Sequence, residues 1–322
     1  MKIMNPVIEQ RADPHIYLHT DGYYYFTASV PEYDRIELRR ARELNELKTT
    51  SAIITAWHKP DSGPYSDLIW APELHFINNQ WFIYFAAAPS REIKDDAFQH
   101  RMYVIGNANE NPLEGEWQFL GQVETGIDAF CLDATTFTHN DKLYYLWAQK
   151  HPDIRGNSSL YIAEMKSPTE LLSQPVLISK PELDWETRGF WVNEGPSVIK
   201  RNGRIFVSYS ASATDENYCM GLLYIDQNDD LLNPNCWHKS PQPVFQTSWE
   251  KNVFLALVII ALLKPKTGNK IYWFTMPAII RKLKATRCGI LIGILAFKVS
   301  LGMKRVFRCL VHHKHAMRKL YE

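Results

Sequence analysis

The stretch that decides the fold is Leu132-Asp-Ala-Thr-Thr-Phe-Thr-His-Asn-Asp-Lys-Leu-Tyr-Tyr-Leu-Trp-Ala-Gln149. It consists of an apolar and β-branched run, a two-residue turn and an aromatic run. Aromatic and β-branched residues favour strands, and a short Asn/Asp turn between two such runs is typical of a β-hairpin. The stretch therefore predicts two antiparallel strands.

Three other segments repeat this pattern: Asp13–Ala28, Glu73–Ala88 and Glu194–Ser212. The second residues of the four turns fall at positions 22, 79, 141 and 203, in steps of 57, 62 and 62 residues. A repeat of this length, built from strands and hairpins, predicts an all-β propeller in which each blade is a four-stranded sheet around a central axis.

Three carboxylates share nearly the same phase of the repeat. Asp13, Asp133 and Glu194 lie 9, 8 and 9 residues before their turn positions. Taken singly, Asp13 before Pro14 could be a turn residue, and Glu194 a solvated loop acid. Asp133 among apolar neighbours is costly unless it is paired or functional. Because equivalent positions on different blades converge on the axis, the common phase predicts one site.

The composition is that of a globular protein without a disulfide framework. The 322 residues suffice for one large all-β domain or two smaller ones, and 13% of them are aromatic. The five cysteines are scattered and form no CxxC pair. The first 13 residues contain no apolar segment typical of a signal peptide, which predicts a cytoplasmic location.

The net charge of +1 hides two unlike parts. Up to residue 263 the chain holds 22 basic and 34 acidic residues, whereas residues 264–322 hold 14 basic residues and one acid. The apolar runs Leu255–Leu263 and Gly289–Phe297 are nine residues each, too short for a bilayer span of roughly 20. A basic arm for nucleic acid usually lacks such apolar blocks. Neither a membrane nor a nucleic acid is therefore expected as a partner.

A shifted reading frame explains the basic tail better. If each codon begins at the last base of the written one, Lys270–Lys284 permits the text DLLVYHARNYTEIK. An Asp-Gly turn becomes possible around Thr267–Gly268, about one period after Gly203, and would belong to a fifth blade. We therefore predict a propeller domain of about four blades in residues 1–253 and an aberrant, out-of-frame tail in residues 254–322, with the break near Trp249–Phe254.

The repeated motifs resemble glycoside hydrolase family 43, whose members are five-bladed propellers acting on arabinose- and xylose-containing polysaccharides. The matching stretches, in order, are Arg11-Ala-Asp-Pro-His-Ile-Tyr17, Ile69-Trp-Ala-Pro-Glu73, Leu132-Asp-Ala-Thr-Thr-Phe137 and Val192-Asn-Glu-Gly-Pro196. The runs Ser208–Asp215 and Tyr218–Gly221 look like the α-L-arabinofuranosidase members. The resemblance covers about residues 5–250 and stops beyond Val253.

The resemblance implies an inverting glycosidase, in which the base and the acid stand roughly 6.5–9.5 Å apart with a water between them. Asp13 would be the general base and Glu194 the general acid. Asp133 would orient Glu194 and raise its pKa by like-charge proximity. No cofactor is required for the chemistry. A structural central metal such as calcium occurs in relatives, but the histidine that helps to hold it is missing here, and no metal ligand is predicted.

Other residues are candidates for substrate binding. Trp70, Phe190 and Trp191 could stack on the furanose, although blade packing is the usual role of a single propeller aromatic. Glu73 would contact sugar or support the site. His15 follows Asp13 by two positions and faces the same side of a strand, as a substrate contact or a satisfied core histidine.

The predicted function is release of arabinose from arabinan- or arabinoxylan-derived oligosaccharides. The alternatives are a β-xylosidase or endo-arabinanase of the same fold, a sugar-binding pseudo-enzyme, and a membrane-attached protein. An incomplete propeller exposes edges and apolar faces. The chain as written is therefore expected to fold poorly and to be nearly inactive.

Overall fold

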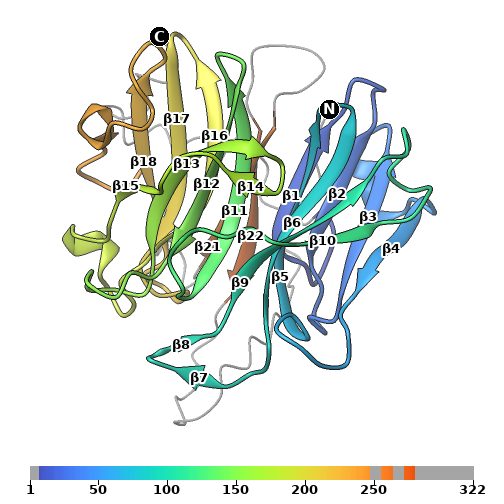
Figure 1. The fold of residues 1–322 in the computed structure, drawn as a ribbon, viewed down its shortest axis with the longest axis horizontal. Coiled ribbons are helices and arrows are strands. Elements are labelled where there is room, and N and C mark those ends of the chain that lie inside the picture. Colours follow the sequence, from blue (N-terminus) through green and yellow to red (C-terminus); the bar gives the residue numbers. More distant parts are fainter. Residues whose placement is uncertain (1–6, 247–254, 264–271, 280–322) are drawn as a thin grey trace.

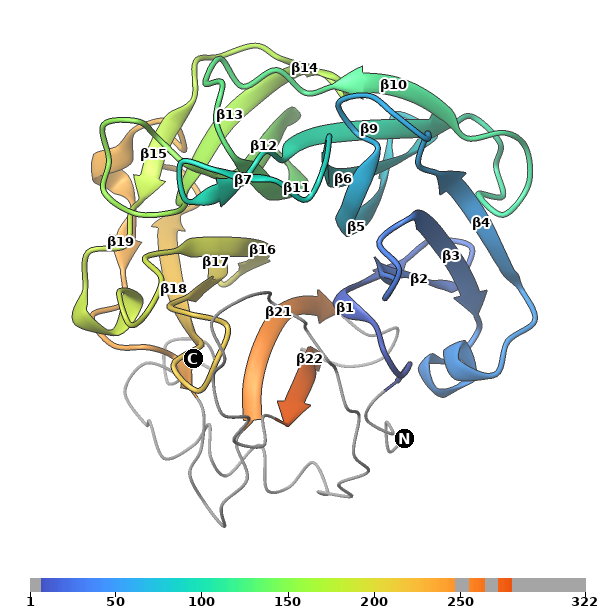
Figure 2. The ribbon, with the colours of Figure 1, turned by 90° about the horizontal axis from the view of Figure 1, so that it is seen from below.

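The computed structural model describes residues 7–246, 255–263 and 272–279. Four antiparallel sheets stand around a common axis in chain order, each with its first strand innermost (Figure 2). This arrangement confirms the all-β propeller. Helices among the described residues are confined to three 3-10 turns, namely η1 (Leu44–Lys48), η2 (Asp184–Glu186) and η3 (Pro234–Cys236). None of them is long and apolar enough to cross a membrane.

The first two blades are four-stranded sheets. Blade 1 contains β1 (Ala12–Leu18), β2 (Tyr24–Ser29), β3 (Arg35–Ala41) and β4 (Ile53–His58). Blade 2 contains β5 (Asp67–Ile77), β6 (Gln80–Ala88), β9 (Arg101–Asn107) and β10 (Gln118–Gln122). Between β6 and β9 the chain forms a small hairpin that projects from one end of the propeller (Figure 1), made of β7 (Ile93–Lys94) and β8 (Ala97–Phe98).

The next two blades each carry one extra short strand. Blade 3 contains β11 (Cys131–His139), β12 (Lys142–Gln149), β13 (Ser159–Ser167) and β14 (Glu170–Leu171), with β15 (Val176–Ser179) also paired to β13. Blade 4 contains β16 (Asn193–Arg201), β17 (Arg204–Ala211), β18 (Cys219–Asp226) and β19 (His238–Lys239), with β20 (Phe245–Gln246) also paired to β18.

A fifth sector separates blade 4 from blade 1. It holds the antiparallel strands β21 (Leu255–Leu263) and β22 (Tyr272–Ile279), and β21 contacts both β16 and β1 (Figure 2). The sector thus contains two described strands where a full blade has four. The predicted break near 249–254 and most of the predicted tail lie outside the described residues.

The four predicted hairpins are present as β1–β2, β5–β6, β11–β12 and β16–β17. In the last three turns both central residues have positive φ, for example 47° and 60° at Asn140 and Asp141. This is the geometry of a type I′ turn, whose twist matches that of the flanking strands and which Asn, Asp and Gly tolerate best. The turn chemistry therefore fixes the register of each hairpin.

The core lies between adjacent blades. The second strand of each blade is almost wholly buried, because side chains on both of its faces pack against neighbouring sheets. Trp81, Tyr25, Trp147 and Tyr145 on these strands are fully buried. A large aromatic buries roughly 150–250 Å², so these rows of rings contribute much of the hydrophobic stabilisation. The interfaces hold the innermost strands in place around the axis.

Candidate active site

A repeated β-bulge lies on the innermost strand of every complete blade. Register shifts in β1, β5, β11 and β16 coincide with left-handed residues: Asp13 (φ 51°), Ala71 (44°), Asp133 (53°) and Gly195 (57°). Their spacing of 58, 62 and 62 residues follows the repeat. Positive φ is uncommon for residues other than glycine, and bulges often re-aim side chains near functional sites. The shared phase of the carboxylates therefore has a backbone cause; Glu194 precedes its bulge residue by one.

Asp13 is held by a relay from the next blade. The Ser29 hydroxyl donates to Asp13 Oδ2 at 2.8 Å, and the backbone N–H of the bulge residue Ala71 donates to Ser29 Oγ at 2.8 Å. Burial raises the pKa of Asp13 to about 6, and the Ser29 hydrogen bond opposes that rise. The carboxyl group of Asp13 thus ionises at about pH 6, and its ionised form can accept a proton.

Asp133 is buried and is also bound by the next blade. The N–H of Gly195 donates to Asp133 Oδ2 at 3.0 Å. Burial raises the pKa of Asp133 well above its ordinary value, and the negative charges of Glu194, Asp13 and Glu73 raise it further. The like-charge repulsion predicted between Asp133 and Glu194 is present, but it acts on the pKa of Asp133.

Glu194 accepts a hydrogen bond from the Tyr218 hydroxyl at 2.9 Å on Oε1. Burial raises the pKa of Glu194 to about 7; the Tyr218 hydrogen bond lowers it and the charge of Asp13 raises it. As the pH rises, Asp13 therefore loses its proton before Glu194 does. Two carboxyl groups with separated pKa values are what acid–base chemistry on one substrate needs.

A second layer of polar residues lies two positions after the bulges. His15 Nε2 is 3.7 Å from Glu73 Oε2, and the hydroxyl of Thr135 is hydrogen-bonded to Glu73. His75, two positions further along β5, brings its Nε2 to 3.3 Å from the same Glu73 oxygen. The structure therefore brings the predicted residues His15 and Glu73 together, close enough to the carboxylates for the charge of Glu73 to act on Asp133.

The ligand atoms of His15, Glu73 and His75 lie within 4.8 Å of one another, as metal ligands do. Burial lowers the pKa of His15 to about 4 and that of His75 to about 3, so both rings are neutral. However, the N–H of Leu74 donates to His15 Nδ1 at 3.2 Å. A neutral imidazole that accepts at Nδ1 carries its proton on Nε2, and a protonated nitrogen cannot bind a metal. This donor set does not fit a metal ion.

The three aromatic candidates differ in what their rings can offer. Trp70 stacks on His100 with a centroid distance of 4.0 Å, and Phe98 of the β7–β8 hairpin meets it edge-on. Trp191 has the guanidinium of Arg155 over its ring at 3.9 Å. Both indoles thus have one face occupied by protein. Phe190 is 50% exposed and belongs to no buried cluster of the described residues.

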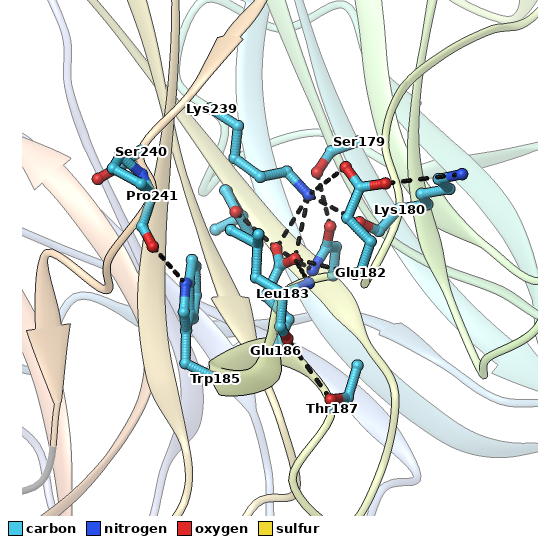
Figure 3. A network of polar contacts seen from close by, with 12 residues as sticks. Ser179, Lys180, Glu182, Leu183, Trp185, Glu186, Thr187, Lys239, Ser240 and Pro241 are labelled. Atoms are coloured by element: carbon cyan, nitrogen blue, oxygen red, sulfur yellow. Dashed lines mark hydrogen bonds and ion pairs between the residues drawn. The ribbon is translucent and has the colours of Figure 1, made fainter.

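A buried ionic network fixes the start of the strand that carries Glu194 (Figure 3). Glu186 is fully buried, and Lys239 Nζ lies 3.1 Å from both of its carboxylate oxygens. Glu186 also accepts from Tyr209 Oη at 2.8 Å and from Asn193 Nδ2 at 3.0 Å. Asn193 immediately precedes Glu194, so this network holds the backbone beside the candidate acid.

Sequence reasoning missed Ser29, His75, Tyr218 and the Glu186 network. His75 could have been found, because it follows Glu73 by two positions and shares its face of the strand. Tyr218 stood in a recognised motif without a role. Ser29 and Glu186 carry no sequence signal, since their contacts join residues far apart in the chain.

A family model described as glycosyl hydrolases family 43 matches residues 3–256. The chain is 52% identical over 244 residues to an extracellular exo-α-(1→5)-L-arabinofuranosidase of Streptomyces avermitilis, covering 76% of this chain and 50% of that protein. A protein of the same name from Streptomyces chartreusis is 49% identical over 241 residues, covering 75% and 72%. The chain thus spans about half the length of the first of these relatives.

A crystal structure of an α-L-arabinofuranosidase from Lactobacillus brevis superimposes with a TM-score of 0.84 at 51% identity, covering 88% of each chain. The names of the Streptomyces relatives correct one expectation. The predicted cytoplasmic location is wrong, because both relatives are named as extracellular enzymes.

Proposed function

The chain belongs to family 43 of the glycosyl hydrolases, and from this premise we propose that it is an inverting α-L-arabinofuranosidase. It releases arabinose from arabinan- or arabinoxylan-derived oligosaccharides. The observation that carries the proposal is that Asp13 and Glu194 lie on the innermost strands of two blades, close enough for the charge of Asp13 to raise the pKa of Glu194, with pKa values of about 6 and about 7. The names of the relatives supply the sugar.

The proposed reaction is a single displacement. Ionised Asp13 takes a proton from a water molecule, whose oxygen attacks the anomeric carbon. Glu194 gives its proton to the glycosidic oxygen as the bond to the leaving sugar breaks, so one proton is taken up and one is released. Asp133 accepts a hydrogen bond from the bulge amide of Gly195, and this contact keeps the backbone beside Glu194 in place.

Substrate contacts are proposed for five further residues. Phe190 is exposed and Trp191 is partly exposed, so each can pack on an apolar sugar face. Trp70 offers the ring face that His100 leaves open. Glu73 and His15 lie deeper, and their polar atoms suit hydroxyl groups of the furanose. Because the two Streptomyces relatives are named as extracellular enzymes, we propose that this chain acts on its substrate outside the cell.

We also propose that the complete propeller has five blades and that residues 254–322 are read out of frame. The family match ends at residue 256, close to the proposed break. The strands β21 and β22 lie in the sector where the fifth blade belongs (Figure 2). Restoring the frame in the gene across codons 246–257 should increase activity strongly, whereas strong activity of the chain as written would contradict this proposal.

The function is tested on the frame-restored chain with nitrophenyl α-L-arabinofuranoside and with arabino-oligosaccharides, using proton NMR to identify the first anomer formed. We expect β-arabinose first, and a loss of about 100-fold or more in kcat for Asp13→Asn and for Glu194→Gln on oligosaccharides. Release of α-arabinose first would refute inversion. Faster cleavage of a xyloside, or tight binding without cleavage in calorimetry, would replace the proposal by a xylosidase or by a sugar-binding protein.

A further inference from the structure

Tyr218 is a buried tyrosine of blade 4 whose hydroxyl is hydrogen-bonded to the proposed acid, Glu194. Its side chain is 1% exposed, and it stands directly before β18. A tight turn fixes its backbone: the N–H of Tyr218 donates to the carbonyl of Asp215 at 3.1 Å, and the Asp215 carboxylate accepts from the N–H of Asn217 at 2.8 Å. The phenol therefore approaches Glu194 from a fixed position.

The direction of the hydrogen bond is determined by its surroundings. Ser210, which lies opposite Glu194 in the β16–β17 ladder, is hydrogen-bonded to the Tyr218 oxygen and favours its charged form, as a donor does. An ionised carboxylate can only accept. The phenol proton of Tyr218 must therefore point to Glu194 Oε1, 2.9 Å away.

This contact distinguishes the two oxygens of Glu194. Oε1 accepts from Tyr218, and Oε2 is not part of this contact. A protonated carboxyl group that accepts at one oxygen carries its proton on the other. Oε2 is thus the oxygen from which a proton can leave towards the substrate.

We propose that Tyr218 is the positioning residue of the general acid: its hydroxyl holds Glu194 Oε1, so that Oε2 presents the proton to the glycosidic oxygen. This inference rests on the role proposed for Glu194. The titratable groups whose charges act on this part of the site are Asp13 from β1 and Asp133 from β11. Asp13 is hydrogen-bonded to Ser29 and Asp133 to Gly195, whereas Tyr218 donates directly to Glu194.

The same hydrogen bond affects the protonation equilibrium of Glu194. Burial and the charge of Glu194 raise the pKa of Tyr218 well above its ordinary value, so the phenol remains a donor throughout the working range. A donor favours the ionised form of a carboxyl group and lowers its pKa. Removal of the hydroxyl should therefore raise the pKa of Glu194.

The experiment compares the Tyr218→Phe variant with the unsubstituted protein and with a matched control variant. Tyr161→Phe is that control, because Tyr161 is also buried and its hydroxyl has no hydrogen-bond partner among the described residues. The Glu194 pKa is read from its carboxyl ¹³C shift, assigned with Glu194→Gln. We expect an increase of about one pH unit in Tyr218→Phe, since a hydrogen bond to a charged group contributes ~1.5 kcal/mol or more. Tyr161→Phe should leave the pKa unchanged.

Kinetics supply a second readout. In the frame-restored chain, Tyr218→Phe should lower kcat about 10-fold on an arabino-oligosaccharide, whose leaving group needs the acid, but less than about 2-fold on dinitrophenyl arabinofuranoside, whose leaving group does not. Ser210→Ala should shift the pKa in the same direction by a smaller amount. An unchanged Glu194 pKa and equal losses on both substrates would overturn the role of Tyr218. Full activity of Glu194→Gln on the oligosaccharide would instead overturn the proposed function.

Discussion

Replacement of Glu194 by Gln should stabilise the protein at alkaline pH but not at acidic pH. The pKa of Glu194 rises from 4.5 to about 7 on folding. Below pH 4.5 the Glu194 carboxyl group is protonated in both the folded and the unfolded protein. Between pH 4.5 and about 7 it stays protonated only in the folded protein. The free energy of unfolding of the wild type therefore falls as the pH rises through this range. A shift of this size corresponds to about 3 kcal/mol, which solvent access to part of the side chain reduces to about 2 kcal/mol.

The assay is urea unfolding of the wild type and of Glu194→Gln at pH 4.5 and pH 8.5. The difference in the free energy of unfolding between the two proteins should be about 2 kcal/mol more favourable to the variant at pH 8.5 than at pH 4.5. Gln keeps an oxygen for Tyr218, so the hydrogen bond is retained. Glu170→Gln, at an exposed ion pair with Lys166, is the control and should behave alike at both pH values. A pH-independent difference for Glu194→Gln would refute the reasoning.

Three further predictions concern the candidate acid and base and the contacts that hold them. The pH profile of kcat/KM should be a narrow bell with limbs at about 6 for Asp13 and about 7 for Glu194, and a broad plateau from pH 5 to 9 would contradict it. Ser29→Ala removes the donor to Asp13 and should move only the acidic limb, upward by about one pH unit; movement of the alkaline limb alone would be inconsistent with the contact. Lys239→Met leaves the buried Glu186 carboxylate without its cation and should cost about 3 kcal/mol, read as a lower Tm, and an unchanged Tm would show that the neutral donors suffice.

The blades could be predicted because their signals are local. Each hairpin combines an Asn, Asp or Gly turn with flanking apolar runs, so period, turn and register appear together in one stretch such as 132–149. The shared phase of Asp13 and Asp133 could be predicted for the same reason, since the bulge repeats with the hairpin. The phase alone, however, did not reveal that Asp13 and Asp133 adopt the left-handed backbone conformation, which changes the direction of their side chains.

Contacts between blades could not be predicted. The bond from Ala71 to Ser29 joins residues 42 positions apart, and Gly195 reaches Asp133 across 62 positions. Their partners depend on how neighbouring sheets pack, which no periodicity in the chain records. The pKa values have the same origin, because burial is the largest cause of the shifts at Asp13, Asp133 and Glu194.

These contacts also explain why the fifth sector matters for the chemistry. A relay ties Asp13 to blade 2 and an amide ties Asp133 to blade 4, so each carboxylate is fixed to the blade that follows its own. Asp13 lies on β1 and Glu194 on β16, the two innermost strands that flank the sector of β21, and β21 contacts both strands. Inversion needs a water-sized gap of roughly 6.5–9.5 Å between base and acid. The packing of this sector therefore helps to set the gap, and a defective filling would move Asp13 relative to Glu194, whose neighbour Gly195 stays bound to Asp133.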